Sequence, residues 1–221
     1  MSELKLTDED RAINQPMEKM VVTYDAYMRK MTFGREQILR QKTVELAFVK
    51  PGDSVLEVGC GTGSLTLEAK RQAGPSGKVV GIDVISSMVE YSQHKAAQEN
   101  LDVAFQLGTI NDLPFPDKSF DAVLCSFMIF HMSKETREKG IAEIFRVLKP
   151  QGRLLIVDLA MPTQPLQQAI AKRIIFRGGL EHELKELIPV LEASGFSEIE
   201  CAPVKFSIFG ISIIAFLRGK A

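Results

Sequence analysis

The chain has 221 residues and a mass of 24.5 kDa, a size that a single α/β domain can fill. Its 27 Lys and Arg residues nearly balance 28 Asp and Glu residues, so no overall positive field favours nucleic-acid binding. Three scattered cysteines exclude a disulfide framework and a zinc-finger pattern, and they suit a reducing compartment. The charged N-terminus is unlike a signal peptide, and the longest apolar run, 206–217, is short of the roughly 20 residues that span a bilayer. We therefore expect a cytoplasmic protein with no metal site and at most peripheral membrane contact.

The first predicted elements are helical. Apolar residues in the segment 1–43 recur at spacings of three and four and form one stripe, namely Met17, Met20, Val21, Tyr24 and Met28. After a turn at residues 51–53, short β-branched runs alternate with longer amphipathic stretches. Strands are predicted at 54–58, 78–83, 102–106, 121–125 and 153–158, and helices at 62–72, 86–98 and 134–148, with Ser86 as the N-cap of the second of these helices.

The strands are nearly continuous apolar runs, which is typical of a parallel sheet covered on both faces. A last helix at 181–194 ends at Gly195, a suitable C-terminal cap. Two further strands, 197–202 and 206–217, follow without a crossover helix and must therefore pair antiparallel. The sequence predicts an α/β fold, with a doubly wound, Rossmann-like, mostly parallel seven-stranded sheet and an antiparallel C-terminal strand.

Three glycines, Gly59, Gly61 and Gly63, stand at alternate positions where the first strand turns into a helix. They allow a sharp turn and a close approach of a ligand to the backbone, whereas a plain tight turn hardly needs three. A dinucleotide fingerprint requires a third glycine where Ser64 stands, so that pattern fits poorly. Glu57, just before the loop, would repel a pyrophosphate but tolerate the ammonium group of an amino acid. These residues favour a ligand with an amino-acid end and no phosphate.

Asp83 closes the second strand, about 20 residues after the glycine loop, where an acidic side chain can accept both hydroxyls of a ribose. This placement suits a nicotinamide site and a nucleoside site alike. An N-cap role for Asp83 is the structural alternative, although Ser86 is also available for that role.

Four segments together resemble a known family: 55–63, Asp83, 113–121 and 144–152. They are similar to class I S-adenosylmethionine-dependent methyltransferases, and within that class to the ubiquinone/menaquinone-biosynthesis (methyltransferase type 11) group. Tyr24-Asp25, followed by Gly34-Arg35, also resembles the N-terminal segment of that group and of bacterial phosphatidylethanolamine N-methyltransferases. The resemblance extends from about residue 24 to the C-terminus, and it implies S-adenosyl-L-methionine as cofactor.

The resemblance also implies a role for particular residues. Contacts to the methionyl part are implied for Glu57, Gly59, Gly61, Gly63 and Ser126, with Glu57 near the ammonium group, and Tyr24 would close over the cofactor from the N-terminal segment. Contacts to the ribose and adenine are implied for Asp83, Val84, Met88, Thr109 and Ile110. Thr109 stands where the family commonly has Asp or Asn, and Asn111 or Asp112 could replace that contact. Met88 could equally fill the core.

The resemblance divides the chain into a helical N-terminal lid (1–43), a cofactor-binding core (44–160), an acceptor-lid insertion (161–180) and a C-terminal helix and strand pair (181–221), all in one domain. In the insertion, an apolar stripe of Leu166, Ala169, Ile170 and Ile174 lies close to Lys172, Arg173 and Arg177. This segment could cover a lipophilic acceptor, meet lipid headgroups, or pack on the sheet edge or on a partner in a homodimer.

In-line methyl transfer requires alignment of the two reactants, and it requires a base only if the acceptor must lose a proton. His131 is the best-placed candidate base, and a capping or packing role is its alternative. We expect a methyltransferase acting on a small, lipophilic, quinol-like acceptor. The alternatives are an N-methyltransferase for phospholipid amino headgroups, a non-catalytic S-adenosylmethionine-binding module, and an NAD-dependent oxidoreductase.

Overall fold

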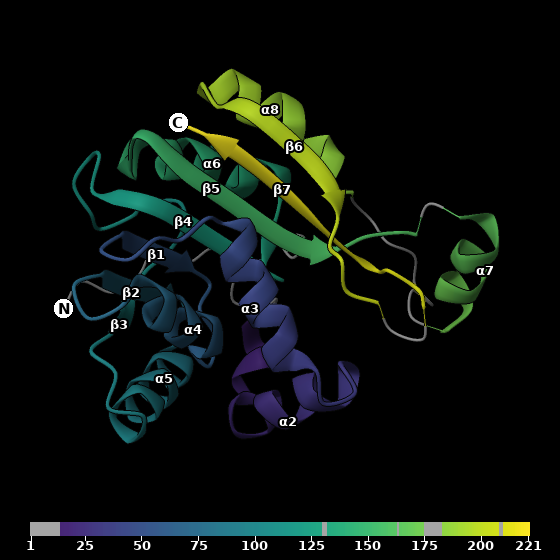
Figure 1. Cartoon of the computed structure of the whole chain (residues 1–221), viewed down its shortest axis with the longest axis horizontal. Helices are drawn as coiled ribbons and strands as arrows, with labels where there is room; N and C mark the ends of the chain where they lie inside the picture. The colour runs from purple at the N-terminus through teal and green to yellow at the C-terminus, as the bar shows by residue number, and fades with distance from the viewer. Residues whose placement is uncertain (1–13, 130–131, 163, 175–182, 208–209) are drawn as a thin grey trace.

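The computed structural model describes residues 14–129, 132–162, 164–174, 183–207 and 210–221. Its centre is one seven-stranded sheet with the strand order β3-β2-β1-β4-β5-β7-β6 (Figure 1). The strands are β1 (Ser54–Val58), β2 (Lys78–Asp83), β3 (Ala104–Leu107), β4 (Phe120–Ser126), β5 (Leu148–Leu159), β6 (Ser197–Pro203) and β7 (Ile214–Lys220). The first five strands are parallel, and β7 runs antiparallel to both of its neighbours. The predicted fold class is confirmed.

Helices cover both faces of the sheet, as the continuous apolar strands require. The helices are α2 (Val21–Met31), α3 (Glu36–Leu46), α4 (Ser64–Ala73), α5 (Ser86–Gln98), α6 (Lys134–Val147), α7 (Pro165–Ile174) and α8 (Ile188–Ser194). Leu39 of α3 and Leu65 of α4 belong to the apolar cluster on one face of the sheet. Ile144 of α6 and Leu191 of α8 belong to the cluster on the other face. The parallel strands therefore end together at one edge, where loops are free to form a site.

The C-terminal part differs from its prediction in two places. The last strand begins at Ile214 rather than at 206, because Pro203 pairs with Ala215 at the end of β6 and has no amide to continue the ladder. The last helix is shorter than predicted. Residues 181–182 are outside the described ranges, and Leu184–Leu187 form a 3-10 helix. The helix α8 begins at Ile188, with Pro189 in its first turn. Gly195 caps it with a positive φ of 103°, as predicted.

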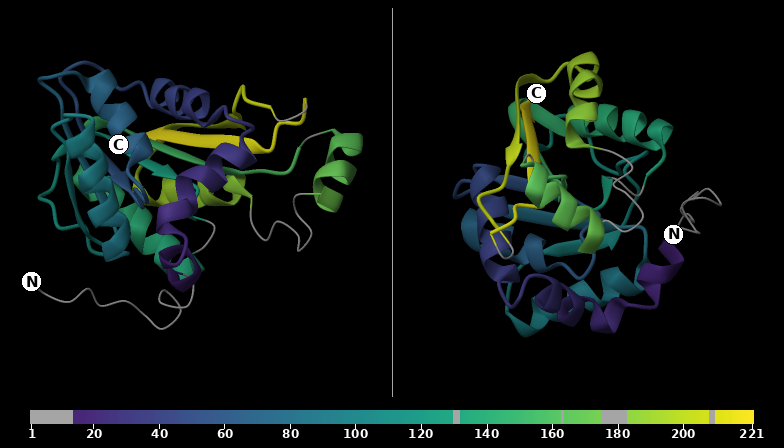
Figure 2. Two further views of the ribbon diagram at one scale, coloured as in Figure 1. Left: turned by 90° about the horizontal axis from the view of Figure 1, so that it is seen from below. Right: turned by 90° about the vertical axis from the view of Figure 1, so that its right-hand side faces the viewer.

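The N-terminal stripe is confirmed: Val21 is buried, and Met17, Met20, Tyr24 and Met28 are half-buried. The predicted N-cap of α5 is wrong. Ser86 is already the first helical residue, and the cap position falls on Ile85, whose amide donates to Asp83 instead. The N-terminal helices lie across the carboxyl edge of the sheet, next to α4 and α5 (Figure 2). Within the described ranges, no helix combines the length and apolarity needed to cross a bilayer.

Candidate functional site

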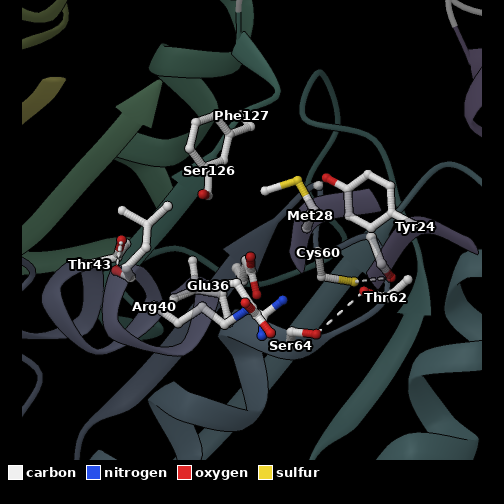
Figure 3. Close-up of a pocket in the computed structure, with 15 residues that line it drawn as sticks. Tyr24, Met28, Glu36, Arg40, Thr43, Cys60, Thr62, Ser64, Ser126 and Phe127 are labelled. Carbon is white, nitrogen blue, oxygen red and sulfur yellow. Dashed lines mark hydrogen bonds between the residues drawn. The ribbon is translucent and has the colours of Figure 1, made fainter. Parts of the chain in front are cut away.

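A small cavity of about 70 Å³ lies at the carboxyl edge of β1 and β4, under α2 and α3 (Figure 3). Of the predicted site residues it brings together Tyr24, Glu57, Gly59, Gly61 and Ser126. Its remaining lining comes from Met28, Glu36, Leu39, Arg40, Thr43, Cys60, Thr62, Ser64, Leu65 and Phe127. Glu57, Gly59, Gly61 and Ser126, expected at the methionyl part, thus line one cavity together with Tyr24, and their ligand contacts stay predictions.

The glycine loop is shaped by its own packing as well as by the cavity. Gly63, at φ 75°, is the left-handed residue before α4, and a Cβ there would lie 2.7 Å from atoms of Phe105 and Ser92. It faces the protein rather than the cavity. Gly61, at φ 51°, lines the cavity, and a Cβ there would meet nothing within 4 Å. The loop therefore presents its backbone to open space at Gly61.

Asp83 holds this loop from the neighbouring strand. One carboxylate oxygen accepts the Gly61 amide at 2.8 Å, and the other accepts the Ile85 amide at 3.0 Å. Asp83 is 8% exposed, and burial raises the pKa of its carboxyl despite these backbone hydrogen bonds. Asp83 does not line the cavity. Its two hydrogen bonds order the glycine loop, and its ribose contact stays a prediction.

Glu57 is the buried acid of the site, with 2% of its surface exposed. Burial raises the pKa of its carboxyl to about 8, opposed by a hydrogen bond from the Thr66 hydroxyl and reinforced by the charge of Asp83. The charge of Arg40 acts in the opposite direction and lowers this pKa. At neutral pH, Glu57 is therefore mostly protonated, and a cation entering the cavity would draw the proton off.

The helix α2 is attached to the loop through Asp25. The Thr62 and Ser64 hydroxyls donate to its carboxylate at 2.8 and 3.2 Å, and Lys95 of α5 forms an ion pair with it. Arg40 approaches to 3.9 Å. Although burial opposes the shift, the hydrogen bonds from Lys95 and Thr62 lower the pKa of Asp25. The carboxylate therefore stays ionised and keeps α2 on the glycine loop.

The predicted adenine residues lie beside the cavity rather than in it. Met88 is 1% exposed and packs with Val21 and Ile85, with Met17, Tyr24 and Val84 against this cluster. Ile110 is buried against Gly140 of α6, and Thr109 is half-buried. Apolar side chains from the N-terminal helices thus occupy the region predicted for the adenine ring. His131, the candidate base, lies outside the described residues.

Sequence reasoning missed Arg40, Glu36 and Thr43 of α3. They follow one another at spacings of four and three, so they form a polar stripe on one helix face. That spacing was the available signal, but it carries no indication of which surface α3 would cover. Tyr24 was predicted on the site, and burial raises the pKa of its hydroxyl to about 12, so it can donate a hydrogen bond but remains protonated at neutral pH.

The chain is similar in sequence to known methyltransferases. A methyltransferase-domain family model matches residues 55–152. The demethylmenaquinone methyltransferase of Deinococcus radiodurans is 31% identical over 180 residues, 81% of this chain and 71% of that protein. The enzyme of the same name from Symbiobacterium thermophilum is 33% identical over 157 residues, 70% of this chain and 62% of that protein. The chain spans slightly less than two thirds of the length of several such relatives.

A solved structure of a SAM-dependent methyltransferase from Aquifex aeolicus has a TM-score of 0.68, 23% identity, and coverage of 92% of this chain and 97% of that one. The sheet order and the glycine loop define the fold as that of the Rossmann-like S-adenosylmethionine-dependent methyltransferases. The relatives narrow this class. The chain belongs to the family of the ubiquinone/menaquinone-biosynthesis methyltransferases.

Proposed function

We propose that the chain transfers a methyl group from S-adenosylmethionine to a small, lipophilic, quinol-like acceptor. The observation that carries the proposal is Glu57, a buried carboxyl directly before a glycine loop whose backbone faces an open space at Gly61. A ligand with an ammonium group would draw the proton from Glu57 and pair with the resulting carboxylate, whereas a pyrophosphate would gain nothing from the protonated carboxyl and would be repelled by its ionised form. The names of the relatives support the quinol class of acceptor.

The residues present fit this cofactor. Besides Glu57 and the loop, Asn111 carries a side-chain oxygen that is buried and finds no hydrogen-bond partner among the described residues. A buried oxygen without a hydrogen bond costs free energy of folding. This oxygen could accept a hydrogen bond from the amino group of an adenine. We propose Asn111 for the contact that Thr109 cannot make well, with Asp83, Val84 and Met88 on the ribose and adenine side.

The cavity of about 70 Å³ is much smaller than the roughly 300 Å³ or more of a typical ligand pocket. Since Val21 packs against Met88 where the adenine is predicted, we propose that residues 1–43 act as a lid that must move to admit the cofactor. The ion pair between Asp25 and Lys95 would then hold the closed arrangement.

S-adenosylmethionine supplies a methyl group on a positively charged sulfur, which leaves as a neutral thioether. The chain has to align the acceptor with that methyl group and exclude water, and such alignment can supply several kcal/mol. Met28, Leu39 and Phe127 give the cavity an apolar wall that excludes water. Tyr24 cannot act as the base at neutral pH because its hydroxyl stays protonated.

Calorimetric titration with S-adenosylmethionine, S-adenosylhomocysteine and NAD tests the cofactor. We expect binding of the first two, and binding of NAD alone would refute the proposal. Turnover is then measured with quinols, phenols and amino-headgroup lipids. Methylation of quinols supports the proposal, methylation of the lipids supports the alternative N-methyltransferase, and cofactor binding without turnover of any acceptor supports a non-catalytic module.

A further inference from the structure

The helix α7 turns its large apolar residues away from the protein. Leu166 is 74% exposed and Ile170 is 37% exposed, while the small residue Ala171 is buried in the apolar cluster with Val204 and Phe206. A helix that belongs only to a soluble core shows the opposite pattern, with its largest apolar side chains inward. We therefore expect a binding partner to cover the outward apolar face of α7.

Positive charge lies on the same outward side. Lys172 and Arg173 are exposed, and helical geometry places Leu166 and Arg173 roughly opposite Ala171. The sequence from 159 to 180 contains no Asp or Glu. Figures 1 and 2 show α7 standing away from the sheet, at the end to which β5 points. The outward face of α7, with Leu166, Ala169, Ile170 and Arg173 and with Lys172 on its flank, combines apolar residues with cations and has no acidic residue.

We propose that the outward face of α7 docks on an anionic lipid surface. Leu166 and Ile170 enter the boundary between headgroups and acyl chains, and Lys172 and Arg173 pair with lipid phosphates. The charge on the helix selects this occupant. In a two-fold dimer through α7, the same cations of two copies would meet without acidic partners from the helix.

The packing of α7 also argues against the role of a cover for the chain's own cavity. Ala171 fixes the inner side, and the Gln167 amide donates to the Gly210 carbonyl at 3.3 Å. The outward face could reach the cavity only if the helix turned over. The purpose of docking rests on the proposed function, because a lipophilic acceptor partitions into the bilayer, but the docking surface itself is independent of that function.

The test is co-sedimentation of the full chain with phosphatidylcholine vesicles, with and without phosphatidylglycerol. We expect binding to the anionic vesicles that weakens with salt. The variant K172Q/R173Q should lose about fivefold in partition coefficient per cation, and L166E/I170E should lose about tenfold per residue. V22E is the matched control, since Val22 is a helical apolar residue that is 80% exposed on α2, and it should bind like the wild type.

Failure of the wild type to sediment with anionic vesicles would overturn the proposal, as would an equal loss in V22E. Loss of a dimer in L166E/I170E, measured by analytical ultracentrifugation without lipid, would show that the face meets a second copy instead. Turnover of a short-chain, water-soluble quinol separates the two proposals. Turnover without vesicle binding refutes docking alone, and vesicle binding without turnover of any quinol refutes the proposed activity alone.

Discussion

Replacement of Glu57 by Gln tests the site most directly, because it removes a charge and keeps the shape. Glu57 is 2% exposed, and burial is the main reason that its pKa lies at about 8. Gln can still accept the hydrogen bond that the Thr66 hydroxyl donates to Glu57. If the ammonium group of the cofactor binds next to Glu57, the carboxyl must lose its proton on binding. The variant cannot do so.

The magnitude follows from that pKa. At pH 7 about a tenth of the ligand-free protein carries an ionised Glu57, and at pH 6 about a hundredth does. The affinity of the wild type should therefore fall about tenfold for each pH unit below 8, and binding at pH 7 should release about 0.9 proton from this group. In E57Q, both contributions should be absent. The α-amino group of the cofactor also titrates, near pH 7.7–8.0 for an ordinary amine, so the difference between the two proteins is the informative quantity.

Isothermal titration calorimetry in buffers of different ionisation enthalpy counts the released protons. E36Q serves as the control, because Glu36 is a half-buried acid on α3 that lines the same cavity; it should keep the wild-type proton count. Equal proton release and equal pH slopes in wild type and E57Q would refute the assignment of Glu57 to the ammonium group.

The same pKa gives a second readout without any ligand. The folded-state pKa of Glu57 is raised above its ordinary value of 4.5, so the folded state holds a proton that the unfolded state has lost. The free energy of unfolding contributed by this group therefore declines as the pH rises from about 4.5 to about 8. Denaturant unfolding should show E57Q gaining stability relative to the wild type across that window. A constant difference across it would contradict the raised pKa.

Three further predictions concern other parts of the chain. G63A should lower the free energy of unfolding by about 2 kcal/mol or more in urea melts, because its Cβ would collide with Phe105 and Ser92 at a positive φ. D25A should weaken the attachment of α2 to the glycine loop by about 1–3 kcal/mol and speed cofactor association in stopped-flow experiments. An unchanged association rate would contradict the proposed role of α2 as part of a lid. R146M should destabilise the chain by about 1–3 kcal/mol in thermal melts, because Arg146 donates to two loop carbonyls and to Glu143.

The parts predicted well are those that short-range pattern determines. The bounds of β1, β2 and α5 agree with the prediction to the residue, because each is an apolar or amphipathic run between turn-forming residues. The last strand was predicted too long for a different reason. The run from Phe206 to Leu217 is apolar except for Ser207, Gly210 and Ser212, but Phe206 and Ile213 are buried in the cluster that contains Ala171 and are not in a strand. An apolar sequence predicts burial, but it does not distinguish a buried strand from a buried loop.

The cofactor side of the site was predictable where the residues belong to one βα turn, and less so where distant segments meet. Arg40 enters the cavity only because α3 packs on α4, and no local pattern encodes that contact. The position of α2 is the larger departure. The resemblance implied that Tyr24 closes over the cofactor and that Met88 contacts its adenine, and the structure packs both residues in one cluster with Val21 between α2 and α5. Under the proposed function, Val21 and the adenine ring would compete for the same contacts with Met88.

That competition would have a thermodynamic consequence. If residues 1–43 act as the proposed lid, cofactor binding must replace the contacts of Val21 with Met88 and Ile85, and part of the binding free energy is then spent on moving α2. V21A would remove some of the competing packing and leave Asp83 and the glycine loop intact. We expect V21A to bind S-adenosylmethionine more tightly than the wild type, by up to about tenfold if the lost packing is about 1.4 kcal/mol. Weaker binding by V21A would show that α2 completes the cofactor site and does not compete with it.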